Sequence, residues 1–157
     1  CASCHKPALP LDSLVFHDPG PFDTAGTLRQ SDLDEPLALD LASLDWVQTL
    51  PRDDRGRVLG PLFGDLKRHR IADAHNDRFG NELLAQRFVA RDVFITAELW
   101  GIGSTAPYGH RGDLTTLNEA ILAHGGAAKA SRNAYADLSE SERQSVGAFL
   151  RSLEIPP

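Results

Sequence analysis

The chain has 157 residues, the length of one domain and enough for a hydrophobic core of its own. Hydrophobic residues make up 41% of it, charged residues make up 24%, and the formal net charge is −6 at pH 7. This composition is that of an ordinary globular protein. The acidic balance and the lack of a basic stripe argue against binding to nucleic acid or to an anionic membrane surface. No apolar run reaches the about 18 residues that a membrane-spanning helix needs.

The chain opens on a C-x-x-C-H motif, in which Cys1 and Cys4 are the only two cysteines and His5 follows directly. This spacing is the attachment signature of c-type haem, with both thiols bound to one haem edge and the imidazole as an axial ligand of the iron. A zinc site, a redox C-x-x-C pair and an adventitious disulfide are the alternatives. Zinc normally takes four protein ligands, and a redox motif should follow a strand. We therefore predict one haem c, covalently bound through Cys1 and Cys4, with His5 as its proximal ligand.

Covalent haem attachment is generally made outside the cytoplasm. We therefore expect a periplasmic or otherwise exported protein, and we expect this chain to be a mature form or a fragment from which upstream sequence has been removed. An acidic haem carrier also favours a basic docking partner.

Residues 17–60 carry turn signals and scattered acidic residues rather than a helical pattern. Over 37–42 leucines alternate with smaller or polar residues, which predicts a short strand or hairpin arm. Residues 51–56 are typical of a polar turn. We interpret 17–60 as a long surface insertion over a compact helical core, because irregular segments of this length are uncommon unless they have a function or contact a partner.

The middle of the chain combines a basic run with apolar stretches. Residues 67–70 are typical of a solvated face. The spacing of the apolar side chains over 79–90 predicts a short amphipathic helix. Residues 94–103 are apolar and end in glycines, which suits a segment packed on a large flat group with Trp100 against it, although a core tryptophan is equally ordinary.

Three helices are predicted toward the C-terminus, over 116–124, 127–137 and 139–153. Glycines end the first helix, and a capping box at Ser139 opens the last. With helices ended by glycine or proline and little convincing strand, the prediction is an all-α domain of short helices around one cofactor, spanning 1–157.

Six separate motifs resemble those of a known family, in the family's order. They are Cys1–His5, Gly64–His69, Leu99–Gly103, Ala106–Gly112, Thr116–Gly126 and the final stretch Leu138–Leu153. The chain resembles the di-haem oxidoreductases, the bacterial cytochrome c peroxidase-like proteins, over residues 1–10 and about 61–155, and the match is to their C-terminal haem domain.

This resemblance implies a cytochrome c fold with one haem c per domain, in an architecture of two such domains. In the bacterial peroxidases the C-terminal haem receives electrons and the N-terminal haem reduces hydrogen peroxide. Only one C-x-x-C-H occurs here, so the chain resembles the electron-transfer half. It departs from the family at Arg111, where the family has Asp after the histidine, and over 95–100, where two prolines are replaced.

The second axial ligand cannot be methionine, because the chain has none. Five histidines remain besides His5: His17, His69, His75, His110 and His124. In the peroxidases a methionine after the helix corresponding to 116–124 ligates the haem, and His124 occupies that place, on the helix face marked by Leu117 and Ile121. The sequence therefore predicts bis-histidine, low-spin iron. The alternative for His124 is a helix C-terminal residue stabilised by the helix dipole.

Two further residues are candidates for the haem pocket. His110 is predicted to lie beside a propionate or between redox centres, with an ordinary loop histidine as the alternative. Tyr108 is a rival oxygen ligand or a hydrogen-bond donor to a propionate, since some relatives use tyrosine on this haem.

Three functional hypotheses follow. The first is electron transfer through a closed haem c to or from another haem or redox protein, as part of a larger complex. The second is a peroxidase-type enzyme domain whose haem opens for hydrogen peroxide, which needs an acid–base group near the iron. The third is a structural subunit in which 17–60 docks onto a larger assembly.

Overall fold

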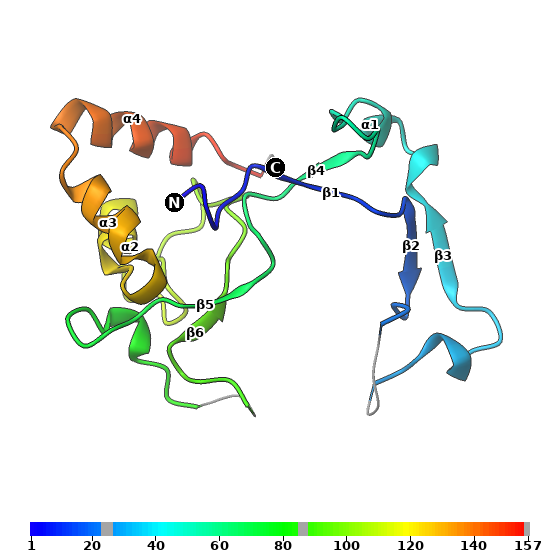
Figure 1. Cartoon of the computed structure of the whole chain (residues 1–157), viewed down its shortest axis with the longest axis horizontal. Helices are drawn as coiled ribbons and strands as arrows, with labels where there is room; N and C mark the ends of the chain where they lie inside the picture. The colour runs from blue at the N-terminus through cyan, green and yellow to red at the C-terminus, as the bar shows by residue number, and fades with distance from the viewer. Residues whose placement is uncertain (23–26, 85–87, 156–157) are drawn as a thin grey trace. The chain divides into compact units, whose positions relative to one another are not determined.

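The computed structural model describes residues 1–22, 27–84 and 88–155 and divides into two compact units (Figure 1). The larger unit joins Cys1–Pro7 to Leu62–Pro157, and the smaller unit is Ala8–Pro61. The smaller unit contains the segment 17–60 that the sequence marks as an insertion. No helix in the described part of the chain is long and apolar enough to cross a membrane.

The smaller unit consists of two antiparallel strand pairs and short helical turns. Its elements are β1 (Ala8–Pro10), β2 (Val15–Asp18), η1 (Gln30–Asp32), β3 (Leu37–Asp40), η2 (Leu41–Ser43), α1 (Asp45–Gln48) and β4 (Leu59–Pro61). Strand β1 pairs with β4 and β2 pairs with β3. Strand β3 confirms the short strand that the leucine alternation predicts. Among the residues of this unit that the structure describes, Val47 and Val58 are the hydrophobic residues that are almost completely buried, at 2% and 1% exposure.

The larger unit begins with an antiparallel strand pair. Strand β5 (Arg68–Arg70) pairs with β6 (Val93–Ile95), and η3 (Arg78–Gly80) lies between them in sequence. The helix predicted over 79–90 is wrong for its described residues, which continue η3 only to Gly80 and then follow bends. Residues 85–87 of that prediction lie outside the described residues. The apolar side chains that suggested the helix, Leu83, Leu84 and Phe88, are exposed rather than packed as one stripe.

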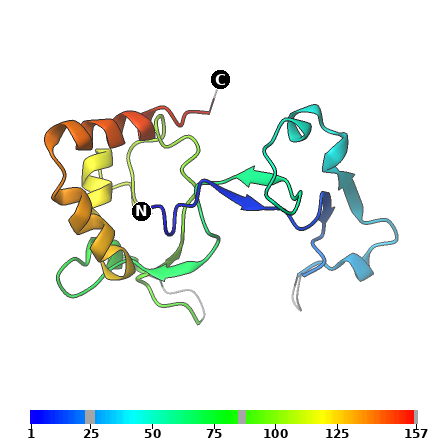
Figure 2. The same ribbon diagram turned by 45° about the horizontal axis from the view of Figure 1, so that its top comes forward.

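The last third of the larger unit is helical, as the sequence predicts. Its elements are α2 (Leu117–Ala123), η4 (Gly126–Ala128), α3 (Lys129–Ala136) and α4 (Glu140–Arg151). In Figures 1 and 2 the N-terminal segment runs through the middle of this unit, with α2 and α3 beside it.

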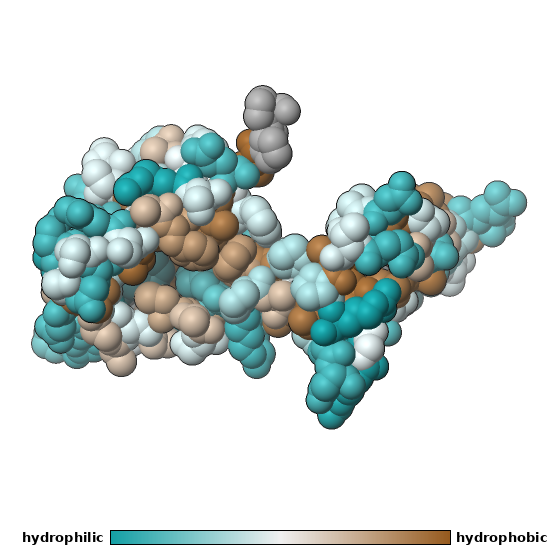
Figure 3. Space-filling view, turned by 90° about the horizontal axis from the view of Figure 1, so that it is seen from above, coloured by the Kyte–Doolittle hydropathy of each residue, from teal (hydrophilic) through white to brown (hydrophobic). Residues whose placement is uncertain are grey.

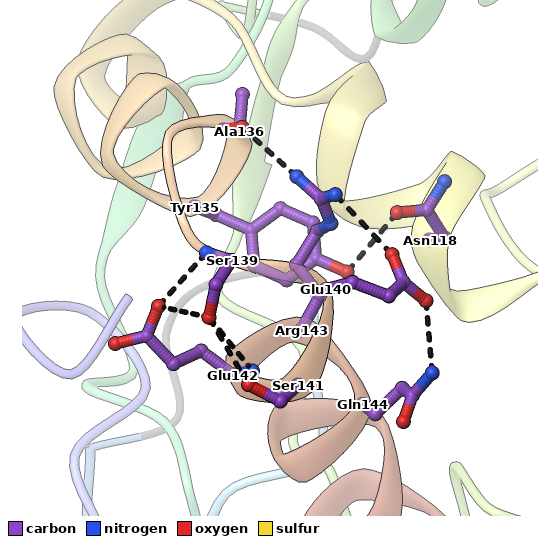
Figure 4. A network of polar contacts seen from close by, with 9 residues as sticks. All are labelled: Asn118, Tyr135, Ala136, Ser139, Glu140, Ser141, Glu142, Arg143 and Gln144. Carbon is purple, nitrogen blue, oxygen red and sulfur yellow. Dashed lines mark hydrogen bonds and ion pairs between the residues drawn. The ribbon is translucent and has the colours of Figure 1, made fainter.

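Helix caps fix where these helices begin. Thr116 accepts the N–H of Glu119 at the start of α2, and Ser139 accepts that of Glu142 at the start of α4, with the glutamate reaching back in both cases. Figure 4 shows the polar network around the α4 cap, in which the Tyr135 hydroxyl donates to Asn118 and so ties α3 to α2. The capping box predicted at Ser139 is confirmed.

The prediction of an all-α, cytochrome c-like fold is wrong. The chain is mixed α/β, with 29% helix and 18% strand in small sheets. The three two-stranded sheets use segments whose turns and prolines prevent long helices, and their pairing joins residues far apart in sequence, such as Arg68 with Ile95. Such pairings leave only weak local signals in the sequence.

A small buried cluster anchors α2 to the rest of the larger unit. Ala72, Phe79, Leu114 and Ala123 form it, with Tyr108 packed against it. After α2 the chain turns at Gly126, which adopts a φ of +50° and approaches the Arg70 carbonyl so closely that a Cβ would overlap it. The glycine stop predicted after residue 124 therefore has a steric cause.

Candidate functional site

The C-x-x-C-H motif folds as a tight turn. The backbone N–H groups of Cys4 and His5 donate to the Cys1 carbonyl at 3.1 and 2.9 Å. Residues spaced like Cys1 and Cys4 in such a turn lie on one side of it. Both cysteines are free thiols, Cys1 exposed and Cys4 partly buried. The N-terminal amine donates to the Ser131 hydroxyl at 2.7 Å, which ties the start of the motif to α3.

His5 is oriented by a residue from a distant part of the sequence. Its Nδ1 lies 3.0 Å from the Phe63 carbonyl oxygen. A carbonyl only accepts hydrogen bonds, so Nδ1 carries the proton and Nε2 is left with a free electron pair. This is the arrangement by which metal-ligating histidines are commonly fixed.

His124 is held in the same way at the end of α2. Its Nδ1 donates to the Ala120 carbonyl at 2.7 Å, which again leaves Nε2 with a free electron pair. The edge of the Phe79 ring packs against the imidazole, with ring centroids 5.1 Å apart. Burial lowers the pKa of His124, and the hydrogen bond to the Ala120 carbonyl only partly opposes this. His124 is therefore a neutral imidazole at neutral pH.

An aromatic group surrounds the residue that orients His5. Phe63 makes edge-to-face contacts with Trp100 and Phe149, at centroid distances of 5.6 and 5.8 Å. Trp100 and Phe149 are nevertheless 44% and 48% exposed. Figure 3 shows that the visible face of the larger unit is hollowed and that hydrophobic residues border the hollow. Trp100 therefore packs on Phe63, the residue whose carbonyl oxygen contacts His5.

The other two predicted pocket residues lie around the buried cluster. The Tyr108 hydroxyl donates to the Ile102 carbonyl at 3.0 Å. His110 stacks on Phe94 with ring centroids 4.6 Å apart, and its Nε2 lies 3.9 Å from a Glu82 carboxylate oxygen. Phe79 contacts the rings of both His110 and His124. His110 is therefore linked to His124 through one phenyl ring and does not join it directly.

The remaining histidines divide between the two units. His17 lies in β2 of the smaller unit, and His75 is exposed in the larger one. His69 is partly buried, and its Nε2 lies 2.8 Å from an oxygen of the Asp65 carboxylate. Its neighbours Lys67, Arg68 and Arg70 are exposed, which confirms the solvated face for those three residues.

Sequence reasoning missed two residues. Phe79 stood at the start of a predicted helix and carried no separate signal. Asp65 contacts His69 four residues later, but the segment is not helical, so this spacing gave no signal in the sequence.

The donor set fits a haem c. Two free thiols are joined by one turn, and two imidazoles have Nδ1 engaged by a backbone carbonyl and Nε2 available, in a unit with exposed aromatic rings. A cluster of half-exposed rings is a surface that a large flat group would cover.

Comparison with known proteins agrees with this fit. The sequence model of the di-haem oxidoreductase family, whose description also names a peroxidase, matches residues 61–153. No curated protein and no solved structure matches the chain. The matched range is more than half of the chain and includes Phe63, Trp100 and His124. Membership of the family implies haem binding, an oxidoreductase function and redox partner domains. The resemblance found in the sequence is thus confirmed, and the chain belongs to the di-haem oxidoreductase family.

Proposed function

We propose that the chain binds one haem c through Cys1 and Cys4, ligates its iron with His5 and His124, and relays single electrons to or from another redox centre. When bound, the haem supplies one-electron exchange at iron. The protein supplies the anchors, the ligand orientation and the surrounding dielectric.

The matched geometry of the two imidazoles carries this proposal. In both histidines Nδ1 is engaged by a backbone carbonyl, so the same nitrogen, Nε2, is available for the metal. The low pKa of His124 keeps its imidazole unprotonated at neutral pH, which a metal ligand requires. His5 and His124 would hold the iron as two imidazole ligands, which would favour a low-spin state with a lower potential than histidine–methionine ligation gives.

The pocket residues take supporting roles in this proposal. Trp100 packs on Phe63, the residue that orients His5, and would shield the haem from water. Tyr108 braces the loop that leads to His110. His110 is a positioning residue that acts on His124 through Phe79.

The cellular setting belongs to the proposal as well. Thioether attachment places the protein outside the cytoplasm, in the periplasm or an equivalent exported location. The partner is another haem or redox protein or domain, and the net charge of −6 favours a docking surface that is basic.

A peroxidase-type function is the second candidate, and one observation favours it. His110 and the Glu82 carboxylate lie 3.9 Å apart, the kind of pair that can hold and move a proton. Reduction of hydrogen peroxide would also need an open iron position, and therefore release of His124.

The absorption spectrum of the purified holoprotein separates the two functions. For the electron carrier we expect low-spin ferric and ferrous spectra, no near-infrared band from a sulfur ligand, and no change on adding carbon monoxide. A high-spin ferric spectrum or ready carbon monoxide binding would contradict the closed site and favour the peroxidase.

A pair of variants then tests the ligand assignment. His124→Ala should convert the iron to a high-spin state that binds carbon monoxide. His75→Ala removes an exposed histidine of the same unit to which no role is assigned, and it should leave the spin state unchanged. A low-spin spectrum that persists in His124→Ala would contradict the ligand assignment.

A further inference from the structure

One carboxylate in the larger unit is buried and fully engaged. Asp65 is only 8% exposed. One of its oxygens accepts the Thr96 hydroxyl at 2.7 Å and the Lys67 backbone N–H at 3.0 Å. The other lies 2.8 Å from Nε2 of His69. These contacts fix the carboxylate at one position, on the segment that follows Phe63.

These contacts keep Asp65 ionised. Burial by itself would raise the pKa of Asp65, but the hydrogen bonds from Lys67, Thr96 and His69 outweigh it and hold the pKa well below its usual range. The carboxylate is therefore negatively charged throughout the neutral pH range. Over residues 1–22, 27–84 and 88–155, the ion-pair partner of Asp65 is His69, which is charged only when protonated.

This carboxylate lies next to one of the two cysteine anchors. The ligating atoms of Cys4, Asp65 and His69 all lie within 4.8 Å of one another. A thioether at Cys4 joins its sulfur to the haem edge. The Asp65 charge would then stand close to that edge, in a partly buried environment where charges are weakly screened.

We propose that Asp65 is a positioning residue for the redox chemistry, a fixed negative charge beside the Cys4 anchor that lowers the reduction potential of the haem. The inference rests on the proposed function. Ferric iron carries one positive charge more than ferrous iron, so a nearby negative charge stabilises the oxidised state. Protonation of His69 would offset part of this effect.

The same three side chains also form a donor set of the kind that binds zinc, a thiolate, a carboxylate and an imidazole. A thioether at Cys4 removes the thiolate from that set. We therefore favour the electrostatic role, and the test below includes the alternative.

The test is redox titration of the holoprotein and of three variants. Asp65→Asn keeps the shape of the side chain and an oxygen for Thr96 and Lys67 but removes the charge, and its potential should be more positive than that of the wild type. Asp65→Glu keeps the charge and should restore a potential near the wild-type value. Glu140→Gln removes an exposed carboxylate whose side chain is 70% accessible, and should change little. An unchanged potential in Asp65→Asn, or equal shifts in Asp65→Asn and Asp65→Glu, would overturn the proposal.

A fourth variant keeps the proposal testable if Asp65→Asn does not assemble. His69→Lys leaves Asp65 in place and puts a permanent positive charge beside it. At pH 9, above the range in which histidines ordinarily titrate, its potential should be more positive than that of the wild type. No shift, or a negative one, would count against the role of Asp65.

Two controls separate the possible failures. Each variant must first show the wild-type absorption spectrum, because a changed spin state would mean failure of the proposed haem ligation rather than of the Asp65 inference. The wild-type titration is then repeated with EDTA and with added zinc. A potential that follows the zinc concentration would assign the three residues to a cation site and overturn the electrostatic role.

Discussion

The two units of this chain differ in how their sequence is used. In the larger unit, apolar side chains are buried around α2, the starts of α2 and α4 are capped, and each predicted haem residue lies there. In the smaller unit, strands β2 and β3 expose Phe16, Leu37 and Leu39, and hardly any side chain is fully buried. The family match, over 61–153, also falls almost entirely on the larger unit.

This difference indicates that the predicted haem site is built by the larger unit alone, and that the smaller unit, Ala8–Pro61, is a separate insertion between two parts of it. The chain leaves the larger unit after Pro7 and returns at Leu62, whose N–H donates to the Pro7 carbonyl at 3.1 Å. The two ends are therefore already side by side within the larger unit. Four experiments test how far the separation holds.

The largest effect is expected at the anchors. Cys1→Ala combined with Cys4→Ala should abolish covalent haem, measured by haem staining after denaturing electrophoresis, because no thiol remains to form a thioether. Val47→Ala, in the core of the smaller unit, is the comparison and should retain the stain. Covalent haem in the double variant would show that the motif is not the attachment site.

A glycine in each unit gives the next effect. Gly126→Ala in the larger unit should lower the free energy of unfolding by about 3 kcal/mol, because the positive φ is strained and the Cβ overlaps Arg70. Gly56→Ala in the smaller unit also has a positive φ, but nothing lies within 4 Å of its Cβ, so about 1 kcal/mol is expected. Chemical denaturation measures both. Equal losses would mean that the close approach at Gly126 relaxes without cost.

Acid should weaken the larger unit through Asp65. Its pKa is lower in the folded than in the unfolded chain, so its contribution to stability is complete above about pH 4, the ordinary carboxyl value, and is lost as the pH falls below it. The thermal midpoint should therefore fall between pH 6 and pH 3, and less so in Asp65→Asn. Asp53 of the smaller unit also has a lowered pKa, because hydrogen bonds from Arg57 outweigh its burial. Asp53→Asn is therefore the matched control, since it removes a comparable carboxylate from the smaller unit. Identical acid profiles for wild type and Asp65→Asn would refute the prediction.

The smallest effect, no change in the haem spectrum, is expected when the smaller unit is deleted. Replacing residues 8–61 by two glycines spans the short gap between Pro7 and Leu62 and should leave the haem spectrum as in the full chain. A lost or high-spin spectrum would show that the smaller unit is needed for the site.

Local signals in the sequence were sufficient for the helical part of the fold. The capping box at Ser139 predicted the start of α4 correctly. The spacing of Leu117 and Ile121 on one helix face likewise predicted α2. Such features depend on contacts within one or two turns, which the sequence displays directly.

Contacts between distant segments were not predictable. The orientation of His5 depends on the carbonyl of Phe63, and a backbone carbonyl has no signature in the sequence. The pairing of β5 with β6 and the approach of Asp65 to Cys4 have the same character. The all-α prediction was wrong for this reason, because it included only the helices, whose caps and side-chain spacing are visible in a short stretch of sequence, and missed most of the strands, whose pairing is not.

The hydrogen bond from His5 to Phe63 also bears on how the protein matures. The two residues are 58 positions apart, with the smaller unit between them in sequence. Attachment of a haem to Cys1 and Cys4 needs the motif alone, whereas the orientation of His5 needs the segment around Phe63 and that of His124 needs α2. On the proposed function, attachment of the haem and ligation of its iron would therefore be separate events in assembly.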